Sequence, residues 1–345
     1  MEQKNDPFAW RSQGGRFDIG GEDDCGISAM IKIGDENLYV VSRKGIHSIT
    51  MADSIDPQRK NPNVRHAKQT ILSYGSDHEL VGRILLQTNV LLGDNFHVVR
   101  RIESKDSLRV AFSFLKEVIA LRELADAYIS EESEKNSTFQ GRPGEDGTLS
   151  VPTIANVEQK AKLFILNSGH AVRHIMGLAQ LFYPDITNEK WVIKLHEKLK
   201  NKLGPDDHSV KFVHEIGPWI WLMRNLRNAV EHEIKNDKVE IKNYRPTEAG
   251  VNPPTVFYKN YDTPLPEIPL SIFMNNTIES LVNCFEMLLV YLCQSEAEPR
   301  GDMFLSLAEI PEKDRLPHEM HVRFRYYMFA KSENSLGGVD NPATQ

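Results

Sequence analysis

Long segments of this 345-residue chain repeat apolar residues every three or four positions. That spacing places the apolar side chains on one side of an α-helix, and such a stripe must be buried against another element. The longest of these segments cover residues 106–130, 156–182, 209–236 and 271–294. We therefore expect a mainly α protein whose core is an antiparallel bundle of the four-helix type.

Strand-like patterns occupy the two ends of the chain. Residues 29–33, 38–41 and 46–51 predict a hairpin with a third strand, and residues 320–329 alternate between apolar and basic or aromatic side chains. We expect the C-terminal strand to join the N-terminal strands, so that a small β module is formed from both termini.

The segments between these strands complete the predicted organisation. Residues 69–92 predict another helix, and residues 239–242 and 256–259 predict a hairpin. We expect three parts. Residues 1–66 form an N-terminal β module, which the strand at 318–330 joins, and residues 67–297 form the helical bundle with a β-hairpin insertion at 238–268. Residues 298–345 hold the C-terminal strand and a polar tail.

The composition limits the classes of function. Hydrophobic residues make up 40% of the chain, which is enough for a core, and the formal net charge is -7. A chain of this charge does not suit wrapping of long nucleic acid through bulk charge, although it leaves room for a local basic cleft.

Cysteine use and hydropathy predict an intracellular protein. Cys25, Cys284 and Cys293 are odd in number and form no CxxC pair, which argues against a disulfide framework and against a zinc site. The N-terminus has no apolar leader, and no run of about 18 apolar residues occurs. We expect a cytoplasmic protein that uses no metal, cofactor or membrane.

Residues 219–235 combine a helical apolar stripe with an unusual polar face. At about 100° per residue, the polar half of the helix holds Arg224, Asn228, Glu231 and His232, with Arg227 at its edge. A guanidinium presents a planar fork of donors that suits phosphate, and an imidazole exchanges protons near neutral pH. The alternative is an ordinary solvated helix face, where arginine and histidine are common.

The run from Arg227 to His232, R-N-A-V-E-H, resembles the signature of the HEPN superfamily, in which four to six residues separate an arginine from a histidine. A polar residue, often asparagine, commonly follows the arginine, as Asn228 does here. The resemblance covers about residues 105–295. It implies an antiparallel helical bundle whose motif lies near the middle or end of one helix and is followed by a final helix.

The same resemblance implies a metal-independent endoribonuclease. HEPN ribonucleases generally form their site where two motifs face each other across a homodimer. Arg227, Asn228 and His232 of both chains would then be catalytic, and the product would end in a 2′,3′-cyclic phosphate. Because unregulated RNA cleavage is toxic, the resemblance also implies a toxin–antitoxin or antiviral defence setting, with RNA as substrate and an antitoxin or regulatory protein as partner.

The residue types fit this chemistry. His232 can act as a general base or acid, Arg227 can bind phosphate oxygens, and Asn228, one helical turn before the histidine, can orient the imidazole or the phosphate. Glu231 follows Arg227 by four residues, so we expect an exposed ion pair between them. Arg224 and Glu231 are further candidates for substrate binding.

A second set of candidates lies in the segment 156–182. His170 and His174 are four residues apart, a spacing that suits a metal ion, but no carboxylate lies between them as in HExxH. A buried or interface polar face is the alternative. If this helix packs beside the motif helix, these histidines and Arg173 would line the same cleft.

The last predicted strand carries a third set. His321, Arg323 and Arg325 alternate along it, so they would share one face. Positive charge beside aromatic residues suits single-stranded RNA. A solvated strand face is the alternative.

Two hypotheses stand beside the ribonuclease. In the first, the motif helix belongs to a non-catalytic scaffold that dimerises or binds RNA or protein, because many HEPN members have lost catalysis. In the second, the terminal β module senses a small molecule and controls the helices. Replacing His232 by alanine separates enzyme from scaffold, since only an enzyme would lose cleavage while keeping its fold.

Overall fold

A computed structural model describes residues 6–12, 26–33, 37–94, 98–99, 101–187, 190–232, 237–248, 250–297 and 303–330. The chain divides into two compact units. The first comprises Met1–Arg109 with Leu289–Gln345, and the second comprises Val110–Leu288. The boundaries therefore fall inside two long helices, not at the predicted positions 66 and 297, and Cys25 and the tail from residue 331 lie outside the described residues.

The helical segments of the described residues are α1 (Ala9–Ser12), α2 (Ala52–Ile55), η2 (Val81–Leu86), α3 (Gln87–Leu92), α4 (Ser104–Thr138), α5 (Val157–Phe182), α6 (Trp191–Leu203), α7 (His208–Glu231), α8 (Leu270–Ser295), η3 (Glu312–Asp314) and η4 (Pro317–Glu319). The strands are β1 (Ile27–Ile33), β2 (Asn37–Ser42), β3 (Ile46–Thr50), β4 (Ala67–Leu72), β5 (Lys238–Lys242), β6 (Arg245–Thr247), β7 (Gly250–Asn252), β8 (Thr255–Lys259), β9 (Leu265–Pro269), β10 (Met303–Glu309) and β11 (Phe324–Ala330).

The first unit holds two separate sheets. Strands β1 to β4 form an antiparallel meander with buried Val41, Ile46 and Ile49 on it, whereas β10 and β11 pair with each other. The side chain of Gln87 in α3 anchors β11, because its amide donates to the Phe324 carbonyl at 2.9 Å and its Oε1 accepts from the Phe324 amide at 2.9 Å. A buried amide satisfied in this way fixes the start of the strand.

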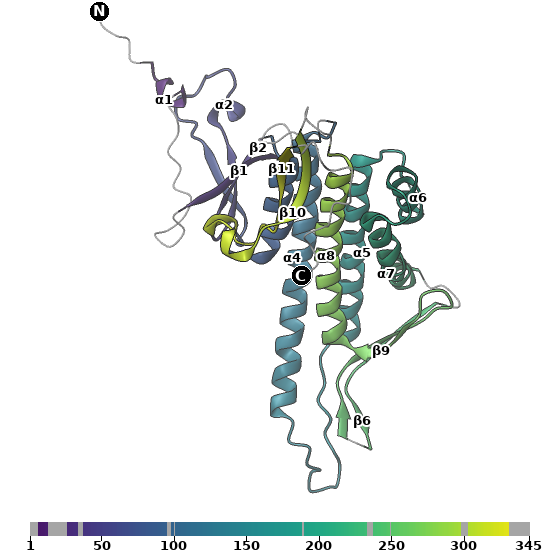
Figure 1. Ribbon diagram of the computed structural model, residues 1–345. Helices are drawn as coiled ribbons and strands as arrows, with labels where there is room; N and C mark the ends of the chain where they lie inside the picture. Colours follow the sequence, from purple (N-terminus) through teal and green to yellow (C-terminus); the bar gives the residue numbers. More distant parts are fainter. Residues whose placement is uncertain are drawn as a thin grey trace, which may run out of the picture. The chain divides into compact units, whose positions relative to one another are not determined.

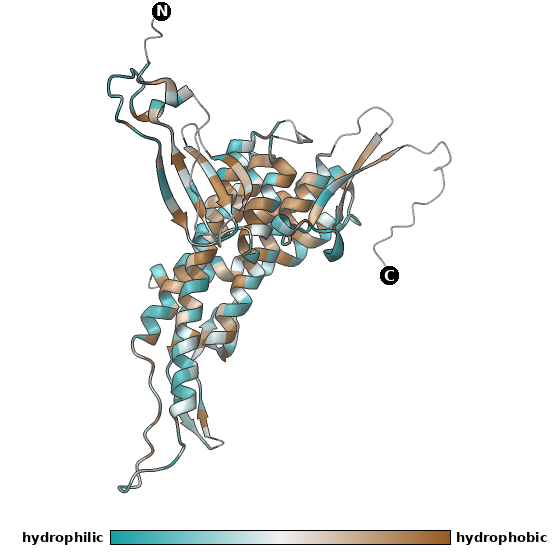
Figure 2. Cartoon of the chain, turned by 90° about the vertical axis from the view of Figure 1, so that its left-hand side faces the viewer, coloured by the Kyte–Doolittle hydropathy of each residue, from teal (hydrophilic) through white to brown (hydrophobic). Residues whose placement is uncertain are grey.

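The second unit is a layered helical region with small sheets at one end. In it α4, α5 and α8 lie side by side (Figure 1), and Phe114 stacks on Phe285 with ring centroids 4.4 Å apart. Hydrophobic stretches gather where the helices pack, as Figure 2 shows. The sheet β5-β8-β9 and the β6-β7 hairpin follow α7 in the chain. Helix α7 begins at a side-chain cap, where Asp207 accepts from the Ser209 amide at 2.8 Å.

The prediction of a mainly α bundle with a small terminal β module is wrong. Of the described residues about 52% are helical and 19% lie in strands, which form four sheets, so the fold is mixed α/β. Residues 69–72, predicted as the start of a helix, belong to β4, which pairs with β3. The C-terminal strand pairs with β10 and not with the N-terminal strands. Strands whose stability depends on a partner distant in the sequence are weakly marked in the sequence itself.

Other expectations are confirmed. The strands predicted at 29–33, 38–41 and 46–51 are β1, β2 and β3, and the predicted hairpin pairs Val239 with Tyr258 and Ile241 with Val256. The segment predicted as a helix at 156–182 is α5. Cys284 and Cys293 are buried, and burial raises the pKa of each thiol to about 12, so both act as small hydrophobes.

Candidate functional site

Helices α5 and α7 pack closely at one glycine. A Cβ added to Gly169 of α5 would lie 2.5 Å from Cδ and 2.9 Å from Cβ of Arg227 in α7. Only a residue without a side chain leaves room there, so Gly169 lets the aliphatic stem of Arg227 cross the face of α5. The side chain of Arg227 is 18% exposed as a result.

Beside this crossing lies a cavity of about 270 Å³, which we call the arginine pocket. It is lined by Gly169, Val172, Arg173, Met176, Trp191, Ile220, Trp221, Arg224, Arg227 and Asn228. Three arginines from two helices and one asparagine therefore line a single hollow, and no aspartate or glutamate is among the described residues that line it. Such a donor set favours an anion with several oxygen atoms, such as a phosphate.

The arginine pocket unites four of the predicted residues. Arg224, Arg227 and Asn228 project from α7, and Arg173 joins them from α5. Arg173 therefore shares a cleft with the arginines of α7, as expected if the two helices pack together. His170 and His174 lie on the same helix as Arg173 but are not among the residues that line the pocket.

Arg227 is held by the carboxylate four residues later. Its Nη2 donates to Glu231, which is the ion pair expected from the spacing. Its Nε is buried and has no hydrogen-bond partner among the described residues. A phosphate entering the pocket would therefore compete with Glu231 for this guanidinium.

His232 departs from the prediction. Helix α7 ends at Glu231, whereas the sequence predicted a helix reaching about residue 235, so His232 is the C-cap with extended backbone (φ -126°, ψ 127°). Its amide still donates to the Asn228 carbonyl at 2.8 Å. The side chain is 72% exposed, and its Nε2 lies 3.9 Å from Oε2 of Glu231. The imidazole thus stands in solvent beside the Arg227–Glu231 pair and does not line the arginine pocket.

The two histidines of α5 are only partly exposed. Burial lowers the pKa of His174, and the nearby Glu117 carboxylate opposes that shift. A neutral imidazole can bind a metal ion, but in the described part of the chain no cluster of three or more His, Cys, Asp or Glu side chains is arranged to hold one.

The prediction that His321, Arg323 and Arg325 share one face of a strand is wrong. Strand β11 begins at Phe324, so His321 and Arg323 lie outside it. Each basic group there has a local partner. Arg325 pairs with Glu319, Arg323 pairs with Glu309 at 3.1 Å, and Nε2 of His321 lies 3.2 Å from the carbonyl oxygen of Asp77. These groups belong to the first unit, and none lines the arginine pocket.

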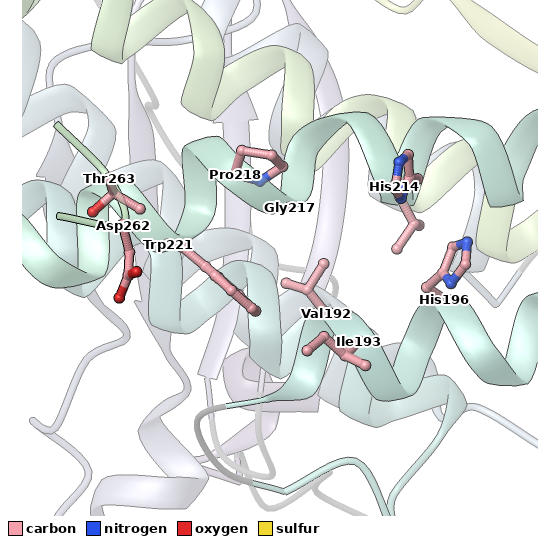
Figure 3. Close-up of a pocket in the computed structure, with 10 residues that line it drawn as sticks. Val192, Ile193, His196, His214, Gly217, Pro218, Trp221, Asp262 and Thr263 are labelled. Carbon is pink, nitrogen blue, oxygen red and sulfur yellow. The ribbon is translucent and has the colours of Figure 1, made fainter. Parts of the chain in front are cut away.

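A second cavity had no counterpart among the sites predicted from the sequence. It has a volume of about 480 Å³ and lies among α6, α7 and the loop before β9 (Figure 3). We call it the apolar cavity, and it is lined by Val192, Ile193, His196, Val213, His214, Gly217, Pro218, Trp221, Asp262 and Thr263. Trp221 lines both cavities. Trp221 lies off the apolar stripe of its helix, and a large apolar residue in that position was the one sign of this cavity in the sequence. The sequence does not show where the loop that closes the cavity lies.

Comparisons with models of protein families, with curated proteins and with solved structures find no match for this chain. Among the described residues, no helix is both long and apolar enough to cross a membrane.

Proposed function

We propose that this chain is an RNA-binding protein of HEPN type that cleaves RNA without a metal ion. The observation that carries the proposal is the arginine pocket, where Arg173, Arg224 and Arg227 line one cavity together with Asn228. Phosphate groups of a nucleic acid backbone are the anions that such convergent arginines suit. The run R-N-A-V-E-H, which resembles the HEPN signature, supports RNA as the substrate.

The proposed reaction is transfer of a phosphodiester within the RNA. A base removes the proton of the 2′-hydroxyl, and the 2′-oxygen attacks the phosphorus atom. The bond from phosphorus to the 5′-oxygen breaks, and that oxygen takes up a proton, so the products are a 2′,3′-cyclic phosphate and a 5′-hydroxyl. Arg227 would stabilise the charge on the phosphorus oxygens, and Asn228 would orient the phosphate.

Proton transfer is assigned to His232. Because its side chain is 72% exposed, it is open to a substrate bound across the end of α7. One imidazole cannot accept the first proton and donate the second at the same moment. We therefore propose a homodimer in which His232 of one chain acts as base and His232 of the partner chain acts as acid.

RNA binding without cleavage is the second candidate. It is favoured by one observation, namely that His232 does not line the pocket that holds the three arginines. In this case the chain would be a scaffold, and the arginine pocket would still bind phosphate.

The cellular setting follows from the reaction. We propose a cytoplasmic ribonuclease whose toxicity is restrained by an antitoxin or another regulatory protein. Growth arrest on expression of the native chain, but not of His232→Ala, would support this setting, and equal growth would count against it.

The test is cleavage of mixed cellular RNA by the purified protein in EDTA. We expect products that end in 2′,3′-cyclic phosphate, and a loss of rate of about 100-fold or more in His232→Ala. Arg227→Ala should lose cleavage as well, whereas Arg325→Ala should match the native protein. Cleavage that needs a divalent metal, or that survives in His232→Ala, would overturn the mechanism. RNA binding without any cleavage would favour the scaffold.

A further inference from the structure

The apolar cavity adjoins the arginine pocket through one shared side chain. Trp221 lines both, so a ligand that fills one lies beside the other. The volume of about 480 Å³ falls in the usual range for small-molecule sites, about 300–1,000 Å³. It is therefore large enough for a nucleobase.

The middle of the apolar cavity offers a flat stacking surface. Figure 3 shows Trp221, Val192 and Ile193 between its two ends. Trp221 and Ile193 are each 37% exposed, so part of each apolar surface is open to a ligand. An unstacked base of single-stranded RNA gains favourable contacts on an indole of this kind.

At one end of the apolar cavity lie Asp262 and Thr263, in the loop before β9. Asn260 Oδ1 accepts from the amides of Asp262 at 2.9 Å and Thr263 at 2.8 Å. The Asn225 side chain of α7 donates to the Thr263 hydroxyl at 2.9 Å, which ties the loop to the helix. These bonds hold the backbone of Asp262, an exposed residue that lines the cavity.

The other end carries two imidazoles. The rings of His196 and His214 lie 5.6 Å apart between their centroids, one from α6 and one from α7. An imidazole N–H can donate to N7 or O6 of a purine. Pro218 has no amide hydrogen, so it cannot give the His214 carbonyl the usual helical hydrogen bond.

We infer that the apolar cavity binds a guanine base of single-stranded RNA while an adjacent phosphate occupies the arginine pocket. This inference rests on the proposed function. A carboxylate accepts hydrogen bonds only, and guanine is the base that presents two neighbouring N–H donors on its Watson–Crick edge. Adenine and cytosine present one amino group beside an acceptor, which would face the charge of Asp262, and uracil presents a single N–H. Asp262 therefore determines the specificity, and Trp221 supplies stacking for any base.

The test compares two RNA strands on the full-length protein. One is an all-uridine hexamer, and the other carries one guanosine in the middle; both have 2′-O-methyl groups, which block attack by the 2′-oxygen. Binding is measured by fluorescence anisotropy. We expect the native protein to bind the guanosine strand about tenfold more tightly, as a bidentate base contact allows.

Three variants identify the source of the preference. Asp262→Asn should lose it while keeping affinity for all-uridine RNA, and Trp221→Ala should bind both strands several-fold more weakly. Asp206→Asn, whose carboxylate is 99% exposed on the loop before α7, is the matched control and should keep the preference.

The outcomes separate the two proposals. Equal affinity of the native protein for both strands, or a guanosine preference that survives in Asp262→Asn, would overturn the guanine site and leave the arginine pocket standing. Failure of the native protein to bind either strand would overturn the proposed function, and the guanine site with it.

Discussion

Two groups of arginines in this chain look alike in the sequence but differ in the folded protein. Arg323 and Arg325 each face a carboxylate in the same small region, Glu309 and Glu319. Arg173, Arg224 and Arg227 instead converge on one cavity from two helices. Arg227 also has a carboxylate partner, so an ion pair alone does not separate the groups.

The difference shows that the grouping of several arginines around one cavity matters more for ligand binding than the number of positive charges. An exposed arginine that pairs with one carboxylate contributes little to stability and offers little to a ligand. Three arginines that line one hollow can donate to the same anion, which then gains several charge-assisted hydrogen bonds at once. We therefore propose the arginine pocket, and not β11 with its flanking residues, as the RNA site.

The largest expected difference between the two groups lies in RNA affinity. Arg227→Ala should weaken binding of a single-stranded RNA about tenfold or more, because it removes a charge-assisted contact with phosphate. Arg325→Ala should change the affinity less than twofold. Fluorescence anisotropy on the same strand measures both. If Arg325→Ala weakened RNA binding more than Arg227→Ala, the distinction between the two groups of arginines would be wrong.

A smaller effect is expected from the glycine that positions Arg227. Gly169→Ala places a Cβ 2.5 Å from Arg227 Cδ, so the two helices must shift, and the free energy of unfolding should fall by about 1–3 kcal/mol. Gly177 of the same helix is the matched control, because its nearest atom would be 3.8 Å away. Gly177→Ala should stabilise the protein by about 0.5–1 kcal/mol through helix propensity.

Chemical denaturation of both glycine variants gives these free energies. RNA affinity should fall in Gly169→Ala and stay constant in Gly177→Ala. If both variants were equally stable and bound RNA equally well, the close crossing at Gly169 would not position Arg227.

The smallest effect concerns His174, on the helix that supplies Arg173. Burial lowers its pKa, so the folded state takes up a proton less readily than the unfolded state. The contribution of this residue to stability is therefore complete above about pH 6.5, the unfolded value, and is lost as the pH falls below it. His174→Gln should show a shallower decline of unfolding free energy between about pH 7 and pH 5. A decline as steep as that of the native protein would contradict this explanation.

The sequence predicted the parts of the site that depend on local pattern. Periodicity predicted α5 and α7, and the chemistry of the motif singled out Arg224, Arg227 and Asn228. The end of α7 was missed because V-E-H-E-I-K contains no glycine or proline to mark it. His232 consequently leaves the helix and becomes exposed.

The parts that depend on tertiary packing were not predictable. The role of Gly169 appears only when α5 crosses α7, and the cavity beside Trp221 requires a loop whose position depends on Asn225 and Asn260. The fold class was wrong for a related reason. Strands such as β4 and β10 gain their stability from pairing partners and not from their own alternation.

The salt dependence of RNA binding tests most directly whether the arginine pocket holds phosphate. The logarithm of the association constant falls linearly with the logarithm of salt concentration, by about 0.7 per phosphate contact on single-stranded nucleic acid. We predict that Arg173→Ala, Arg224→Ala and Arg227→Ala each reduce that slope, by no more than about 0.7 because the three arginines share one phosphate, whereas Arg325→Ala leaves it unchanged. A native slope retained in the three pocket variants would contradict the assignment of the arginine pocket as the RNA site.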